Sequence, residues 1–186
     1  PADVWTHIAG TYDGTTTSLY INGVLDTSTT TITGAIGTNT DSLFIGADRV
    51  GTTVNQFFIG NIDEVRVWNV ARTAAQILRD RFSSLAVITG TAAPLVNGTY
   101  SGLLASWRFN GNTIDESGSL TIDNGVARNI TYLDLRQKAI NYLDYNNTVR
   151  VDGANGYCVS PPNASYNAIT ALTLEAWVRP DTTATT

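Results

Sequence analysis

One oxygen-rich loop of this sequence offers side chains of the kind that bind a hard cation. It spans residues 110–119, where Asn110, Asn112, Asp115, Glu116 and Ser117 carry side-chain oxygens among glycines. Ca²⁺ takes about six to eight such ligands from carboxylates, amides and waters. The same residue types also close Asx turns, in which Asp, Asn or Ser side chains accept hydrogen bonds from nearby backbone N–H groups. The residues leave both hypotheses open, a calcium site and a hydrogen-bonded turn.

Residue arrangements typical of catalysis are missing from the sequence. His7 is the single histidine and lies in an alternating run, where a structural role is expected. Cys158 is the single cysteine, so it forms no disulfide within the chain, and its flanking residues predict a buried, inert thiol. The sequence has no phosphate-binding glycine loop, no nucleophile motif and no zinc-type spacing. We therefore predict that the protein is not an enzyme.

Composition argues against two classes of partner. The chain has 186 residues, is 42% hydrophobic and carries 11 basic against 16 acidic residues, a net charge of -5. This balance provides no positive patch for a phosphate backbone, so nucleic acid is not expected as a partner. No apolar run approaches ~18 residues, so membrane insertion is not expected. The chain is rich in threonine and lacks methionine, which we interpret as favouring an extracellular or cell-surface location.

Short strands joined by turns must position these side chains. Residues 4–12 alternate in polarity and stop at the turn signal Asp13-Gly14, and Asn22-Gly23 separates two apolar runs as in a β-hairpin. Further strands are expected within residues 41–48, 57–69, 102–111, 148–160 and 171–181. Trp5, Trp107 and Trp177 fall within alternating strands and are expected in the core.

One short helix interrupts the strand pattern, and one linker divides the chain. Thr73 is a candidate N-cap, and Ala75, Leu78 and Phe82 follow at helical spacing. Residues 86–101 lose periodicity and gain Gly, Pro and Ser, which predicts a linker between the stretches 1–85 and 102–186. Residues 132–145 fit either a helical turn or an irregular strand with a loop.

Four phrases of the sequence resemble the laminin G-like jelly roll of the concanavalin A-like lectin/glucanase superfamily. They are WTHIAGTYDGTTTSLYINGV (5–24), FFIGNIDEVRVWNVARTAAQI (57–77), GLLASWRFNGNTIDESG (102–118) and ALTLEAWVRPD (171–181). The resemblance implies an all-β, antiparallel jelly-roll sandwich of the concanavalin A-like type with one short helix.

The order of the phrases differs from the order in that family. Residues 1–85 resemble the C-terminal half of the jelly roll, and residues 102–186 resemble its N-terminal half. Three arrangements stay open: a junction of two tandem repeats, a circular permutant that folds as one jelly roll, and an exchange of halves between neighbouring chains. The strands that the family carries between its halves are absent here, which would leave exposed sheet edges.

The resemblance also implies where a cation would bind. The first and last strands of the family are neighbours, so Asp63 and Glu64 are expected near the oxygen-rich loop, where many jelly rolls of this kind bind structural calcium. The predicted Ca²⁺ ligands are Asn110, Asn112, Asp115, Ser117, Asp63 and Glu64. The paired-carboxylate run of the glucanases is not matched, because Asn61 occupies the position of the nucleophile.

The function implied by the resemblance is recognition without catalysis. We predict an extracellular adhesion or carbohydrate-binding module, one repeat unit of a larger surface or secreted protein, with glycans or surface proteins as partners. Tyr157 and Tyr166, near turns, are the candidate sugar-binding residues. The alternative is a structural subunit of an extracellular filament or surface layer, in which neighbouring copies share half-domains. A third hypothesis is an accessory module attached to a glycoside hydrolase.

Overall fold

A computed structural model of the protein shows short β-strands and few helical residues. The structure describes residues 2–31, 33–83, 101–117, 124–134, 147–167 and 169–182. The strands are β1 (Thr6–Tyr12), β2 (Thr16–Ile21), β3 (Val24–Thr31), β4 (Leu43–Ile45), β5 (Asp48–Val50), β6 (Thr53–Asn55), β7 (Ile59–Trp68), β8 (Leu103–Trp107), β9 (Val126–Arg128), β10 (Thr131–Asp134), β11 (Asn147–Asp152), β12 (Tyr157–Ser160) and β13 (Leu172–Pro180). The helices are α1 (Ala74–Asp80) and the 3-10 turn η1 (Ala164–Tyr166).

Two turns predicted from the sequence shape the N-terminal strands. The Oδ1 of Asp13 accepts hydrogen bonds from the backbone N–H groups of Thr15 and Thr16, at 2.9 and 2.7 Å. Asn22 and Gly23 have φ values of 53° and 81°, as the tight turn of a two-residue hairpin needs. Both turn predictions are confirmed.

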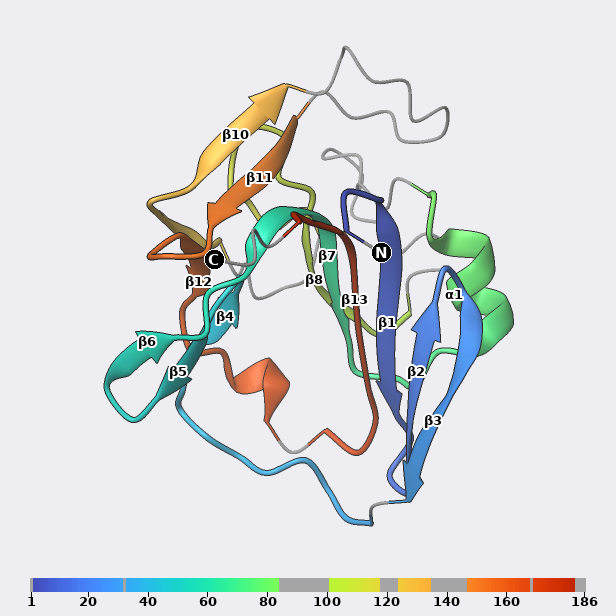
Figure 1. The fold of residues 1–186 in the computed structure, drawn as a ribbon. Coiled ribbons are helices and arrows are strands. Elements are labelled where there is room, and N and C mark those ends of the chain that lie inside the picture. Colours follow the sequence, from blue (N-terminus) through green and yellow to red (C-terminus); the bar gives the residue numbers. More distant parts are fainter. Residues whose placement is uncertain are drawn as a thin grey trace, which may run out of the picture.

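Two antiparallel sheets form the two layers of the fold (Figure 1). The larger sheet has the order β10-β11-β7-β13-β1-β2-β3, and β8 pairs with β7 further along that strand. The smaller sheet has the order β4-β12-β9, and β5 and β6 form a separate hairpin. The predicted all-β, antiparallel fold with one short α-helix is confirmed for the described residues, and it is consistent with a concanavalin A-like sandwich.

Strands from the two predicted stretches of the chain alternate in the larger sheet. β13, from the C-terminal stretch, lies between β7 and β1 of the N-terminal stretch. The two stretches therefore share one sheet, while the assignment of each stretch to a half of the family's jelly roll stays a prediction. The predicted linker, residues 86–101, lies almost wholly outside the described residues, so the domain boundaries stay a prediction. Of the undecided stretch, residues 132–134 belong to β10, and residues 135–145 lie outside the described part.

The main apolar core lies between the two sheets. Ile45 and Cys158 come from the smaller sheet. They pack against apolar residues of β7, β8 and β11 and of the segment after β8, namely Ile62, Val67, Ala105, Trp107, Phe109, Val149 and Val151. Burial raises the pKa of the Cys158 thiol to about 12, so this thiol stays protonated at neutral pH, as expected for an inert cysteine. Trp107 and Trp177 are buried as predicted, whereas Trp5 is half-buried.

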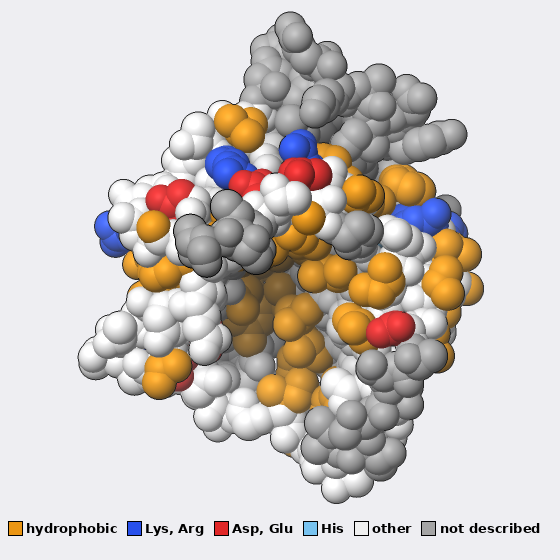
Figure 2. Space-filling model, viewed as in Figure 1, with side chains coloured by type: hydrophobic (Ala, Val, Ile, Leu, Met, Phe, Trp, Pro, Cys, Tyr) orange, Lys and Arg blue, Asp and Glu red, His pale blue; other side chains and the backbone are white. Residues whose placement is uncertain are grey.

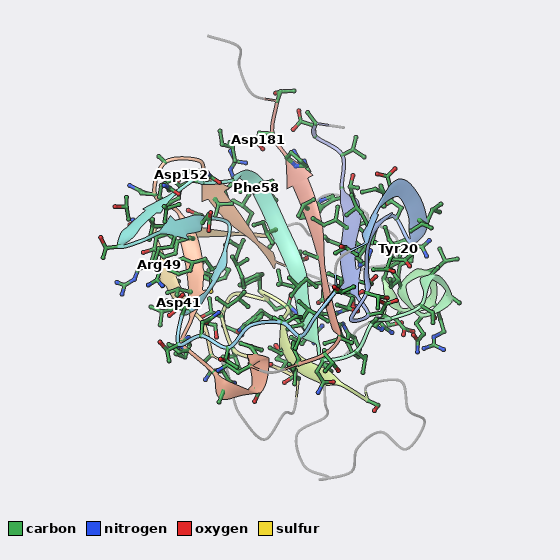
Figure 3. The ribbon with its side chains drawn as sticks, turned by 90° about the horizontal axis from the view of Figure 1, so that it is seen from below. Tyr20, Asp41, Arg49, Phe58, Asp152 and Asp181 are labelled. Carbon is green, nitrogen blue, oxygen red and sulfur yellow. The ribbon has the colours of Figure 1, made fainter. Side chains whose placement is uncertain are left out.

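α1 covers part of the opposite face of the larger sheet. Thr73 caps the helix, because its Oγ1 accepts a hydrogen bond from the Gln76 N–H while the Gln76 Oε1 accepts one from the Thr73 N–H. The N-cap prediction is confirmed. The apolar side chain that the helix buries is Ile77, which packs with Ala9 and Tyr20 beside the helix (Figure 3). In the described part of the chain, no helix has the length and apolarity needed to span a membrane.

The close approach of β7 to β13 predicts an intolerant glycine. Gly60 has a φ of 146°, and a Cβ there would lie 2.3 Å from the Arg179 carbonyl oxygen and 2.9 Å from the Pro180 Cα. We expect Gly60→Ala to lower the free energy of unfolding by about 2 kcal/mol or more, because the paired backbones must shift. Urea unfolding followed by tryptophan fluorescence measures this change.

Gly37→Ala is the matched control for this substitution. A Cβ at Gly37 meets no atom within 4 Å, so the change in free energy should stay within about 0.5 kcal/mol. Equal unfolding midpoints for the two variants would contradict the close approach at Gly60.

Candidate functional site

The oxygen-rich loop folds back onto β8. The Oδ1 of Asp115 accepts hydrogen bonds from the backbone N–H groups of Ser106 and Ser117, each at 2.9 Å. The Oδ1 of Asn112 accepts one from the N–H of Ile114, also at 2.9 Å. Hydrogen bonds from backbone N–H groups to Asp and Asn side chains are what the hypothesis of a hydrogen-bonded turn predicts. Within the described residues, no group of three or more His, Cys, Asp or Glu side chains is placed to hold a metal ion.

Arg108 joins the loop to β7. Its Nε lies 3.2 Å from the Oε1 of Glu64, and its Nη1 lies 3.2 Å from the Oε2 of Glu116. The structure therefore brings Glu64 and the loop together, as the resemblance implied, with a guanidinium between the two carboxylates. The Oδ1 of Asn110 is buried and has no hydrogen-bond partner among the described residues.

A β-bulge turns two carboxylates of β7 into the protein. The pairing of β7 with β13 shifts register at this point, and Glu64 has a φ of 50°. Asp63 is buried, and its Oδ1 accepts a hydrogen bond from the Glu64 N–H at 3.0 Å. Burial, followed by the negative charge of Glu64, raises the pKa of the Asp63 carboxyl well above its usual value. A carboxyl of this kind is protonated more readily than an exposed aspartate.

A buried charge network on the α1 side of the larger sheet was not predicted from the sequence. The Oε1 of Glu175 accepts hydrogen bonds from the Trp68 Nε1 at 3.0 Å and the Arg72 Nη1 at 3.2 Å, and lies 3.5 Å from the Arg66 Nη1. The guanidinium of Arg72 stacks on Trp68, with its Cζ 4.0 Å from the ring centre. All four side chains are buried. The sequence contains a sign of this network, because Glu64, Arg66 and Trp68 alternate with two valines and so share one face of the strand.

Arg66 also holds the C-terminal end of α1. Its Nη1 donates a hydrogen bond to the backbone carbonyl of Asp80 at 3.1 Å, and its Nη2 donates one to the carbonyl of Ser83 at 2.6 Å. The Asp80 carboxylate accepts hydrogen bonds from Arg72 and Arg79. A cation near the last carbonyls of a helix satisfies acceptors that lack partners within the helix.

His7 lies beside this network and is neutral. Its Nε2 is 3.7 Å from the Oε2 of Glu175, and its ring packs edge-on against Trp177 at 5.3 Å. Burial and then the nearby positive charges of Arg66, Arg81 and Arg72 lower the pKa of His7 to about 3. The structural role predicted for His7 agrees with this environment.

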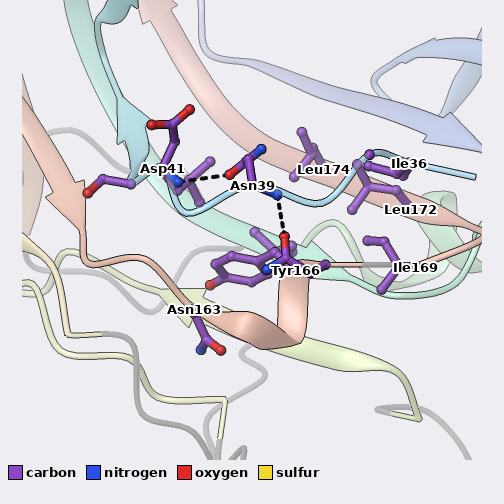
Figure 4. Close-up of a pocket in the computed structure, with 13 residues that line it drawn as sticks. Ile36, Asn39, Asp41, Asn163, Tyr166, Ile169, Leu172 and Leu174 are labelled. Carbon is purple, nitrogen blue, oxygen red and sulfur yellow. Dashed lines mark hydrogen bonds between the residues drawn. The ribbon is translucent and has the colours of Figure 1, made fainter. Parts of the chain in front are cut away.

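A groove with a polar rim opens on the other face of the larger sheet, and we name it the Tyr166 groove. It has a volume of about 210 Å³. Figure 4 shows the ring of Tyr166 in it, near the side chains of Asn39, Asp41 and Asn163. Its apolar lining includes Ile36, Leu43, Ile169, Leu172 and Leu174.

Hydrogen bonds fix the rim of the Tyr166 groove. The Asn39 N–H donates to the Oδ1 of Asn167 at 3.0 Å, and the Oδ1 of Asn39 accepts from the Asp41 N–H at 2.9 Å. Tyr157 does not line this groove. Its ring packs against Phe44 and Phe57, with ring centres 5.6 and 6.2 Å away. The structure therefore separates the two tyrosines predicted to bind sugar.

The buried charge network predicts a large effect of removing Glu175. We expect Glu175→Ala to lower the free energy of unfolding by about 3–5 kcal/mol, because Arg66 and Arg72 lose a buried countercharge. Urea or thermal unfolding measures the change. Asp41→Ala is the control, since Asp41 pairs with Arg49 at the surface (Figure 3) and an exposed ion pair contributes little. Similar losses in both variants would contradict the structural role of the network.

The lowered pKa of His7 predicts a specific dependence of stability on pH. Between pH 6.5 and about 3 the unfolded chain binds a proton at His7 and the folded chain does not, so folding loses stability as the pH falls. Relative to His7→Gln, the wild type should lose about 1.4 kcal/mol per pH unit below pH 6. The difference between the two proteins isolates His7 from carboxyls such as Asp63. Parallel stability profiles between pH 4.5 and 7 would show that His7 titrates normally.

Comparison with known proteins places part of the chain in a family context. Residues 1–78 match a laminin G family model described as the concanavalin A-like lectin/glucanases superfamily. Among curated proteins, pappalysin-1 of Mus musculus is 36% identical over 80 residues, a match that covers 41% of this chain and 5% of pappalysin-1. The chain thus matches only a small part of that relative's length. No solved structure matches the chain. The matched stretch contains β1 to β7 and the start of α1, and it supports the concanavalin A-like architecture.

Proposed function

We propose that this chain is a non-catalytic extracellular recognition module that binds carbohydrate in the Tyr166 groove. The observation that supports this proposal is an aromatic ring in a groove whose rim carries three asparagines and one aspartate. Sugar rings present apolar C–H faces, which pack on aromatic rings, and hydroxyl groups, which pair with planar amides and carboxylates. The match of residues 1–78 to a lectin/glucanase superfamily is in line with this chemistry.

The polar rim is held in place by the protein's own hydrogen bonds. The side-chain oxygens of Asn39 and Asn167 accept hydrogen bonds from the backbone N–H groups of Asp41 and Asn39, respectively. Among the described residues, neither Nδ2 donates a hydrogen bond. Each Nδ2 therefore has donors for a ligand hydroxyl, and its orientation is set by the bond at the other end of the amide. Such preorganisation reduces the entropy that ligand binding costs.

Burial of the β7 carboxylates supports the non-catalytic part of the proposal. A glycoside hydrolase needs two carboxyl groups that flank its substrate. Asp63 and Glu64 are each 1% exposed, and Glu64 pairs with Arg66 and Arg108. Neither residue lines the Tyr166 groove. The proposed extracellular location follows from the family match, since laminin G-like domains typically occur in extracellular proteins.

The structural calcium stays a prediction with a direct test. A cation held by Asp115 and its neighbours would stabilise the folded state, so calcium would raise Tm and a chelator would lower it. A loop held only by the hydrogen bonds of Asp115 and Asn112 has the same Tm in both conditions. Melting curves in calcium and in EDTA distinguish these two hypotheses.

The alternative function, a filament or surface-layer subunit, draws support from an open sheet edge. Among the strands that the structure describes, β3 lies at the edge of the larger sheet, and Val24 and Leu25 at its start are 65% and 50% exposed. Unpaired edges with apolar residues favour pairing between chains. Sedimentation velocity over a range of concentrations tests this alternative, and a strictly monomeric particle would contradict it.

Carbohydrate binding predicts different effects at the two tyrosines. Tyr166→Ala should reduce affinity at least about tenfold for the glycan that binds best on an array, because it removes the aromatic ring from the groove. Tyr157→Ala, outside the groove, should change affinity less than about twofold. Isothermal titration with that glycan measures both variants. An array of plant, algal and animal glycans without any bound member would contradict the proposal.

A further inference from the structure

Beside β4 the larger sheet has an apolar floor, which we name the apolar groove. Its volume is about 280 Å³, and its floor comes from β1, β2 and β13 through Ile8, Leu19, Leu174, Ala176 and Val178. Figure 2 shows apolar side chains gathered in a hollow at the centre of this face. Leu19 and Leu174 are 37% and 42% exposed, a large fraction for leucines on the inner face of a sandwich. The smaller sheet packs over β8 and over Ile62 and Val67 of β7, two residues that also line the groove.

One wall of the apolar groove is the open edge of a strand. All three residues of β4 (Leu43, Phe44 and Ile45) line the groove. Successive side chains of a strand point to opposite faces, so a groove that meets three successive residues meets the backbone edge. β4 pairs with β12 on its other side, and among the described residues no strand pairs with it on the groove side. Backbone N–H and C=O groups on this side therefore lie next to apolar surface without a strand partner.

The position of the floor restricts what can pair with β4. A partner that brought a complete two-layered sandwich to this edge would overlap the strands β13, β1 and β2, which extend beneath it. A single extended strand avoids this overlap, because it fills only the layer of the smaller sheet. It would satisfy the open backbone groups and cover the apolar floor together.

The charges around the groove define the chemistry of that strand. Among the described residues that line the groove, Glu175 alone is ionisable, and its carboxylate accepts hydrogen bonds from Trp68 and Arg72 on the opposite face of the sheet. The floor offers no countercharge to an incoming side chain, so inward residues of the occupant must be uncharged. Its outward residues face solvent and can be polar.

We propose that the apolar groove binds an extended peptide segment of a partner protein, which pairs with β4 through main-chain hydrogen bonds. The segment has uncharged apolar side chains at alternate positions, and these contact Leu19, Leu174 and Val178. The apolar groove adjoins the Tyr166 groove and shares Leu43, Val67 and Leu174 with it, but Tyr166 lines only the latter. The chain would then carry a site for peptide beside a site for sugar.

A pair of synthetic peptides tests the main-chain component. The probe has about ten residues, roughly the length of a long strand, with alternating Val and Thr between terminal lysines. The control has the same sequence with alternate backbone amides N-methylated, so it keeps the side chains and loses the donors. We expect binding of the probe by isothermal titration, at least about tenfold weaker binding of the control, and slower hydrogen exchange at residues 43–45.

Three protein variants test the location. Leu19→Arg and Leu174→Arg place a charge on the floor from two different strands, so each should weaken probe binding at least about tenfold. Leu78→Arg is the matched control, since Leu78 is an exposed leucine on α1, outside the groove, and should change affinity less than about twofold. Circular dichroism and Tm show whether each variant folds. If one floor variant does not fold, the probe affinity of the other floor variant decides the result.

Four outcomes would overturn the proposal. They are no probe binding up to about 1 mM, equal affinity for the N-methylated control, unchanged binding by both floor variants, and self-association that either floor variant abolishes. The last outcome would assign the groove to a second copy of this chain. None of them bears on glycan binding by Tyr166→Ala, so the two proposals fail independently.

Discussion

Glu175 is a buried countercharge that two arginines near α1 share. Arg66 and Arg72 come from the N-terminal stretch of the chain, whereas Glu175 comes from β13 in the C-terminal stretch, 109 residues from Arg66. A buried guanidinium without a carboxylate is costly, so β13 is stabilised where Glu175 reaches both arginines. This place lies between β7 and β1. The same contact therefore favours the register of the central strands, the position of α1 and the union of the two stretches in one sheet.

The two faces of the larger sheet consequently differ in chemistry. On the α1 side, polar and charged residues of β7 and β13 alternate with the apolar residues that point the other way. On the other side, the smaller sheet, which has three strands in the part of the chain that the structure describes, covers only part of an apolar surface. Both grooves lie on that second side, and Leu43, Val67 and Leu174 line both. Unequal numbers of strands in the two layers thus account for the surface where we propose recognition.

Features that depend on neighbouring residues could be predicted from the sequence. The turn at Asp13, the hairpin at Asn22-Gly23 and the cap at Thr73 each involve contacts within a few residues, and all three are confirmed. The helical spacing in the sequence included Leu78 among the apolar residues of α1, but Leu78 is exposed and the helix buries Ile77. Ala9 and Tyr20, which pack against Ile77, come from distant strands, so no pattern within the helix reveals them.

The candidate sites show the same division between local and distant contacts. Proximity of Glu64 to the oxygen-rich loop came from the family resemblance, but the guanidinium of Arg108 between them depends on how β8 meets β7. Tyr157 and Tyr166 both follow or precede turns, and their sequence contexts do not separate them. Their surroundings do, because Phe44 and Phe57 pack against Tyr157 while Tyr166 lines a groove.

The hairpin turn at Asn22-Gly23 carries a further consequence for variation of this protein. A Cβ at Gly23 would lie 2.7 Å from the Leu78 Cα, and the Oδ1 of Asn22 accepts a hydrogen bond from the His7 N–H at 2.9 Å. The turn is therefore wedged between a helix and a strand, and an insertion there would displace both. The turn of the β5–β6 hairpin is exposed, and a Cβ at Gly51 meets no atom within 4 Å. Of these two hairpins, only β5–β6 leaves room at its tip for a tag, a label or an inserted loop.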